Sequence, residues 1–327
     1  MPREASRHAR PLYAHSAPVS PVRHAKRALP YAVAAAALVW VGLTTDFHEV
    51  GRAWERVSWW KLCAITIPYL IALLIADSIA LWVTVRVALR VPLRFVDVLL
   101  VRGASWLLAL VNYGAGQGGI VWFLHRRHGV PVARATGAVL LATGGFLLAV
   151  VGAVAAGLAS GAVPEAHVPG WLLWLVAIGF PVYLAIIWAR PAFLTRISLL
   201  EPLFAAGIVG TVASTATRAL HLAVLIAAHA LAYRQFGIEV PLSAALVVFP
   251  IIFLAGALPI AVGGYGAPQA TAKVLLVGYA ANHDAGAVIA ASIGFQTLTT
   301  LLMAVMGMIA LRWEVQPAEE PPADLPG

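Results

Sequence analysis

Four ionisable residues lie within long apolar stretches of this sequence, where a charge is costly unless it is paired or faces a polar cavity. They are Asp77, Arg102, Arg218 and Lys273. One hypothesis is that Arg218 and Lys273 line a cavity and hold an anionic phosphate, with Asp77 as partner in the empty state. The alternative is a structural ion pair of Asp77 with Arg102 or Arg218 that only fixes helix packing.

Two histidines share a helical face with Arg218. Spacings of 3 and 11 residues place His221 and His229 within about 80° of Arg218 around a helix axis. Eight residues apart and without a carboxylate, they make a poor metal site. We therefore expect core histidines, and neither a metal nor a cofactor. Lys273 has an alternative of its own, since it could extend toward the outer surface.

The composition requires a membrane around these residues. Apolar residues make up 61% of the chain and charged residues 11%, and the mean hydropathy is +0.87, far from the balance of a soluble domain. A spanning helix needs about 20 apolar residues. Runs of this kind occur at 29–45, 61–85, 135–160, 170–189, 206–232 and 285–311. The sequence thus predicts an all-α polytopic membrane protein with about six spanning helices.

Two further pairs of shorter apolar runs are split by glycines. The pairs are 96–112 with 117–125, and 242–261 with 267–280. Each pair is either a re-entrant hairpin or two thin crossings. We favour re-entrant hairpins, because the second run of each pair is short and a glycine break exposes backbone groups that lipid cannot satisfy.

The second break, "IAVGGYGAPQ" (260–269), predicts a helix that begins inside the membrane. Gly263, Gly264 and Gly266 permit backbone angles forbidden to other residues, and Pro268 suits the first turn of a new helix. Free N–H groups at such a terminus favour phosphate or carboxylate. Gln269 follows and can hydrogen-bond a headgroup, although it cannot act as a counter-ion.

The first break, "NYGAGQGG" (112–119), is built in a similar way. It places the amides of Asn112 and Gln117 beside Gly116 and Gly118, and we include all four in the candidate binding site. For both clusters the alternative is that the glycines only allow tight helix packing.

The two halves of the chain match at an offset of 149 residues. Pro92-Leu93 aligns with Pro241-Leu242, and "ATGGF" (142–146) with "ASIGF" (291–295). Each half reads span, span, broken pair, span, so the halves at about 29–161 and 168–312 should be inverted relative to each other. Inverted repeats with discontinuous helices are typical of secondary transporters.

Basic residues set the expected orientation, because basic loops stay cytoplasmic. The formal charge is +8, and it is concentrated in the N-terminal tail and in the turns near 86–94, 126–134 and 190–196. We expect a bacterial-type cell membrane with both termini cytoplasmic, and disordered tails at 1–28 and 314–327 around one transmembrane domain at 29–313. Anionic lipids, not nucleic acid, are the expected partners of this charge.

At the two glycine clusters the sequence resembles the lysylphosphatidylglycerol synthase transmembrane, or flippase-like, family. The resemblance covers roughly residues 30 to 313 and rests on two motifs: the 112–118 break with its basic turn Arg126-Arg127-x-Gly129, and Pro259 followed by Gly263-Gly264-x-Gly266. It implies a membrane domain that translocates or handles lipids. The chain ends at Gly327, so we expect no aminoacyl-transfer domain in it.

The sequence departs from the family pattern in one respect. Members commonly carry a Glu just after the glycines in both motifs, whereas this chain has Ile120 and Gln269 near those places. No Asp or Glu occurs between Asp97 and Glu165 or between Glu239 and Asp284. An acidic relay for a coupling ion is therefore not expected at either cluster.

These patterns lead us to expect a translocator for an anionic phospholipid or a lipid-linked substrate. The alternatives are a membrane-embedded lipid-modifying enzyme and a non-transporting scaffold that assists a partner lipid synthase. An enzyme would need a general base or metal ligands. The adjacent pair His283-Asp284 is better interpreted as a cap of the last span.

Overall fold

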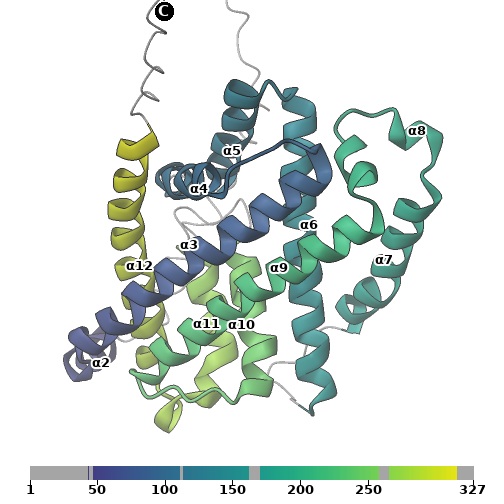
Figure 1. Cartoon of the computed structure of the whole chain (residues 1–327). Helices are drawn as coiled ribbons and strands as arrows, with labels where there is room; N and C mark the ends of the chain where they lie inside the picture. Colours follow the sequence, from purple (N-terminus) through teal and green to yellow (C-terminus); the bar gives the residue numbers. More distant parts are fainter. Residues whose placement is uncertain (1–42, 44–46, 111–112, 162–169, 258–264, 315–327) are drawn as a thin grey trace, which may run out of the picture.

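The computed structural model describes residue 43 and residues 47–110, 113–161, 170–257 and 265–314 (Figure 1). Over these residues the chain is helical, and an isolated bridge joins Ile238 and Ala280. The α-helices are α2 (Phe47–Arg56), α3 (Trp59–Leu89), α4 (Phe95–Ala109), α5 (Tyr113–His128), α6 (Val132–Ala159), α7 (Gly170–Ala189), α8 (Ala192–Thr195), α9 (Glu201–Arg234), α10 (Leu242–Ala257), α11 (Ala267–Leu276) and α12 (Ala285–Glu314). Two 3-10 turns, η1 (Val277–Tyr279) and η2 (Ala281–His283), join α11 to α12.

Four helices are long and apolar enough to cross a membrane. They lie at Trp59–Leu89, Val132–Ala159, Glu201–Arg234 and Ala285–Arg312. The described residues therefore support four spans, against about six predicted from hydropathy. The predicted span 29–45 lies outside the described residues except for residue 43, and the two tails do so except for residue 314, which ends α12. Helix α7 has 20 residues and covers the predicted range 170–189.

The helices α3 and α9 pack along each other and cross the molecule diagonally (Figure 1). With 31 residues, α3 is about 46 Å long, well above the roughly 30 Å of a bilayer core. A helix this long is accommodated by tilting, by kinking or by local thickening of the bilayer. The middle part of α3 contacts the middle part of α9.

Four shorter helices form two packed pairs, α4 with α5 and α10 with α11. The first pair lies at the upper end of the molecule in Figure 1 and the second pair lies lower down. Three of these helices have 15 or 16 residues and α11 has 10, too few to span about 30 Å. Each short pair is followed by a long helix, α6 or α12.

The first glycine cluster was predicted to interrupt a helix, but it lies within one. Helix α5 begins at Tyr113 and runs through all its glycines to His128. The interruption comes earlier, after the helix end at Ala109. Gly116 packs against α4, since a Cβ there would lie 2.9 Å from the Ala109 Cβ. The packing interpretation of this cluster thus holds at Gly116.

The second cluster ends in a helix start, as predicted. Helix α11 begins at Ala267, with Pro268 in its first turn. Gly266 precedes it with φ +98°, a conformation that side chains disfavour. Similarly, Asp284 caps α12, because its Oδ1 accepts a hydrogen bond of 2.9 Å from the Ala287 N–H.

Small residues bring α9 close to α3 and α6. The hydroxyl groups of Thr84 on α3 and Ser214 on α9 are 2.7 Å apart and fully buried. On the other side of Ser214, Gly145 of α6 leaves so little room that a Cβ would lie 2.9 Å from the Ser214 Oγ. Close approach at small residues is the usual way in which membrane helices associate. It fixes the part of α9 that carries Arg218, one turn further along.

Alanine at position 145 should destabilise the protein, whereas alanine at the neighbouring Gly144 should not. The added Cβ at 145 overpacks the contact with Ser214 and should lower the free energy of unfolding by about 1–3 kcal/mol. At 144 nothing lies within 4 Å of an added Cβ, so stability should stay the same or rise slightly. Thermal unfolding in detergent measures both. Equal stabilities would show that the α6–α9 contact is not tight.

Candidate functional site

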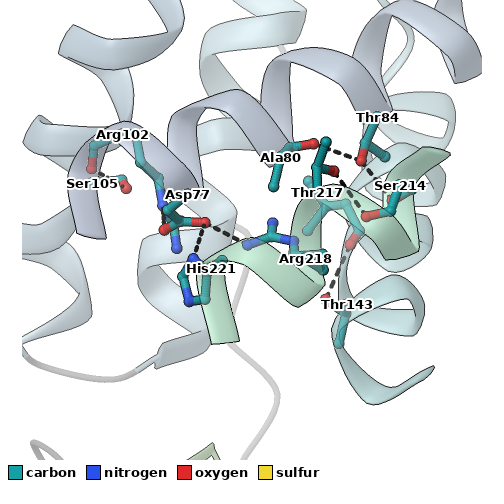
Figure 2. A network of polar contacts seen from close by, with 11 residues as sticks. Asp77, Ala80, Thr84, Arg102, Ser105, Thr143, Ser214, Thr217, Arg218 and His221 are labelled. Carbon is teal, nitrogen blue, oxygen red and sulfur yellow. Dashed lines mark hydrogen bonds and ion pairs between the residues drawn. The ribbon is translucent and has the colours of Figure 1, made fainter. Parts of the chain in front are cut away.

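A buried carboxylate links three helices at the centre of the protein. Asp77, in the middle of α3, is 2% exposed. Its Oδ2 accepts a hydrogen bond from the Arg102 Nε on α4, and its Oδ1 accepts one of 2.5 Å from the Arg218 Nη1 on α9 (Figure 2). Both arginines are themselves less than a tenth exposed. The structural ion pair considered from sequence is therefore present, with both arginines at once.

His221 lies beside the carboxylate of Asp77. Its Nδ1 is 3.5 Å from the Asp77 Oδ1, and Figure 2 shows the ring beside the Arg218 guanidinium. Arg218 and His221 come together because they are three residues apart on one helix. Two guanidinium groups against one carboxylate leave one positive charge uncompensated, before any proton on His221 is counted.

The two arginines and His221 line a cavity of about 590 Å³. Asp77 does not line it, so the carboxylate lies behind the cations that face the cavity. The Arg218 Nε is buried and has no hydrogen-bond partner among the described residues. His229 also lines the cavity, which confirms that Arg218, His221 and His229 share one face.

The start of α11 forms another part of the cavity wall. Pro268 and Gln269 line it, together with Gly256 and Ala257 at the end of α10. The Gln269 Oε1 accepts a hydrogen bond of 2.7 Å from the Gly266 N–H, so this side chain holds the turn before the helix. Gln269 is 1% exposed. The positive end of the α11 dipole thus lies on the same cavity as the arginines.

The remaining predicted site residues lie elsewhere. Gly116, Gln117 and Gly118 are in the first two turns of α5, and only Tyr113 of that helix lines the cavity. Lys273 is half-buried on α11 and is not part of the cavity lining. Asn112, Gly263 and Gly264 lie outside the described residues.

Sequence reasoning missed the contribution of α12. Ser292, Gln296 and Thr299 all line the cavity. Their spacing of four and then three residues puts them on one face of an apolar helix. This spacing is present in the sequence, but uncharged polar side chains in a predicted span indicate a binding site less strongly than charges do.

These features define a class of protein: a polytopic, all-helical membrane protein with a central, partly open cavity whose mostly apolar wall carries two arginines. The family model described as the lysylphosphatidylglycerol synthase TM region matches residues 27–307, and the chain belongs to this family. No curated protein and no solved structure matches the chain.

Replacing Asp77 by Asn should destabilise the protein more than replacing Arg102 by Gln. Without the carboxylate two buried guanidinium groups face each other uncompensated, and the expected loss is about 3–5 kcal/mol. Arg102→Gln still leaves a one-to-one pair of Asp77 with Arg218, so its loss should be smaller. Thermal unfolding in detergent gives the order.

The double variant Asp77→Asn/Arg102→Gln provides the control. It leaves one unpaired cation in place of two, so part of the stability lost in Asp77→Asn should return. A stable Asp77→Asn protein would contradict the assigned role of this carboxylate.

Proposed function

We propose that this protein is a translocator for an anionic phospholipid or lipid-linked substrate, whose headgroup is held in the central cavity. One observation carries the proposal: Arg102, Arg218 and the first turn of α11 line the same cavity. Guanidinium groups and a helix N-terminus both favour phosphate. In a low-dielectric interior their attraction for an anion is much stronger than in water.

The ion pairs with Asp77 are compatible with this role. Each arginine has donors beyond the one that Asp77 accepts, because a guanidinium carries five N–H groups. The buried Arg218 Nε, which has no partner in the described part of the chain, is one of them. Asp77 therefore holds the guanidinium groups in place in the absence of substrate, and an entering phosphate takes up the remaining donors.

The arrangement of helices supports inverted repeats with re-entrant hairpins. Displaced by 149 residues, the range 95–109 falls on 244–258, within two residues of α10. The range 132–159 falls on 281–308, inside or next to α12. In Figure 1, α6 begins at the upper end and α12 begins at the lower end, so the two helices run in opposite directions. Such halves can open a central site to either side in turn.

The basic turns support the proposed orientation. The turn between α3 and α4, the turn between α5 and α6, and helix α8 all lie at the upper end in Figure 1. Eight arginines lie in these turns or at the adjoining helix ends: Arg86, Arg90, Arg94, Arg126, Arg127, Arg134, Arg190 and Arg196. Because basic loops remain on the cytoplasmic side, we propose that this end faces the cytoplasm of a bacterial-type cell.

Lipid movement in proteoliposomes tests the proposal. The wild type should exchange acyl-labelled phosphatidylglycerol between leaflets faster than empty vesicles do. Arg218→Gln should reduce this rate by about tenfold or more, since it removes charge-assisted hydrogen bonds to phosphate. The variant should still fold, because Asp77 keeps Arg102 as its partner.

Arg234→Gln is the matched control. Arg234 lies on the same helix, but its side chain is 69% exposed and 3.7 Å from the exposed Glu239. Exposed ion pairs contribute little, so both stability and exchange rate should match the wild type. If no anionic lipid moves faster than in empty vesicles, the translocator is rejected in favour of a scaffold for a lipid synthase or a lipid-modifying enzyme.

A further inference from the structure

The cavity has a neutral polar wall in addition to its cationic one. Ser292, Gln296 and Thr299 form a polar stripe along α12, and this stripe faces the cavity. Hydroxyl and amide groups inside a membrane domain need hydrogen-bond partners. Side chains of this kind can both donate and accept, which suits a ligand that carries hydroxyl groups.

One member of the stripe has no partner. The Thr299 Oγ1 is buried and makes no hydrogen bond within the described residues. Thr299 as a whole is 8% exposed. An unpaired buried hydroxyl is unfavourable. Because Thr299 lines the cavity, rotation about its Cα–Cβ bond would present the hydroxyl to a ligand hydroxyl there.

The far part of the cavity offers aromatic rings and one histidine. Tyr69, Tyr233, Phe253 and Phe295 line it, and His229 lies among them, with its ring 4.6 Å from Phe253 and 4.9 Å from Phe295. The His229 Nδ1 is 2.8 Å from the Leu225 carbonyl oxygen. Since a carbonyl can only accept, Nδ1 is the donor, and the Nε2 of the neutral ring is left as an acceptor.

This aromatic part is distant from the arginines. Arg218 and His229 are 11 residues apart on α9, which corresponds to about 16 Å along the helix axis. A phosphate held by Arg218 therefore leaves space for a further chemical group between the rings and α12.

The described cavity wall has no acidic side chain to hold an ammonium group. Its lining residues include arginine and histidine but neither Asp nor Glu. The sequence also has no acidic residue between Glu239 and Asp284. A cationic extension of the headgroup would therefore meet two arginines and no carboxylate.

We infer that the headgroup is a phosphate bearing a neutral, hydroxyl-rich extension, that is, a polyol or sugar rather than an amine. The phosphate lies at Arg102 and Arg218, and the hydroxyl groups lie against the α12 stripe and His229. This inference rests on the proposed function, because it names the substrate class of the same cavity.

Two lipids of equal net charge test it. Acyl-labelled phosphatidylinositol carries a neutral polyol, and acyl-labelled phosphatidylserine carries an ammonium and a carboxylate. In proteoliposomes the wild type should move phosphatidylinositol several-fold faster than phosphatidylserine. Thr299→Val keeps the shape of the side chain and removes the hydroxyl, so it should slow phosphatidylinositol by about three- to tenfold and leave phosphatidylserine unchanged.

Two further variants separate the hydroxyl from general damage. Thr299→Ser retains the hydroxyl and should keep the wild-type rate. Thr136→Val removes an exposed hydroxyl that bonds only the Val132 carbonyl in the described structure, and it should change nothing. Equal rates for the two lipids, or an equal effect of Thr299→Val on both, would overturn the inference while the translocator stands. If neither lipid moves while phosphatidylglycerol does, the inference fails and the translocator stands. If phosphatidylglycerol does not move either, the translocator fails and the inference fails with it.

Discussion

The buried carboxylate of Asp77 is the interaction on which the centre of this protein depends. It accepts hydrogen bonds from Arg102 on α4 and Arg218 on α9, and so joins three helices far from bulk water. A lone charge in that position would be prohibitive, and even a paired one is retained at a cost. The pairing holds two guanidinium groups at fixed positions inside the membrane domain, where neither could remain without a counter-charge.

The ion pairs of Asp77 also determine which charged groups line the cavity. Asp77 lies behind the arginines, so the charged side chains that line the cavity are the two guanidinium groups. The first turn of α11 adds the positive end of a helix dipole, while α12 adds neutral hydrogen-bonding groups. The charged groups of the wall thus lie near Arg218, and uncharged polar groups lie toward His229. The apolar outer surfaces of the four long helices separate these polar groups from lipid.

The sequence predicted the ion pair of Asp77 with Arg102 or Arg218, because a charge in an apolar span has few ways to be satisfied. It also placed Lys273 in the cavity, and Lys273 does not line it. Gly266 and Pro268 likewise marked the start of α11. The glycines of α5 led to the wrong prediction of a break at that point. Lipid offers the backbone no competing hydrogen bonds, so a helix tolerates glycine there. The polar stripe of α12 requires knowledge of which helix face meets the cavity, and that depends on tertiary packing.

Direct access to the cavity is the measurement that tests the central claim. Cys63 is the only cysteine of the chain, so Cys63→Ala provides a background for a single cysteine at Thr143, which lines the cavity on α6. A charged, water-soluble thiol reagent should label this cysteine in neutral phosphatidylcholine, and anionic lipid should slow the labelling several-fold through Arg218. Labelling that is equally fast in neutral and anionic lipid would contradict a headgroup site in this cavity.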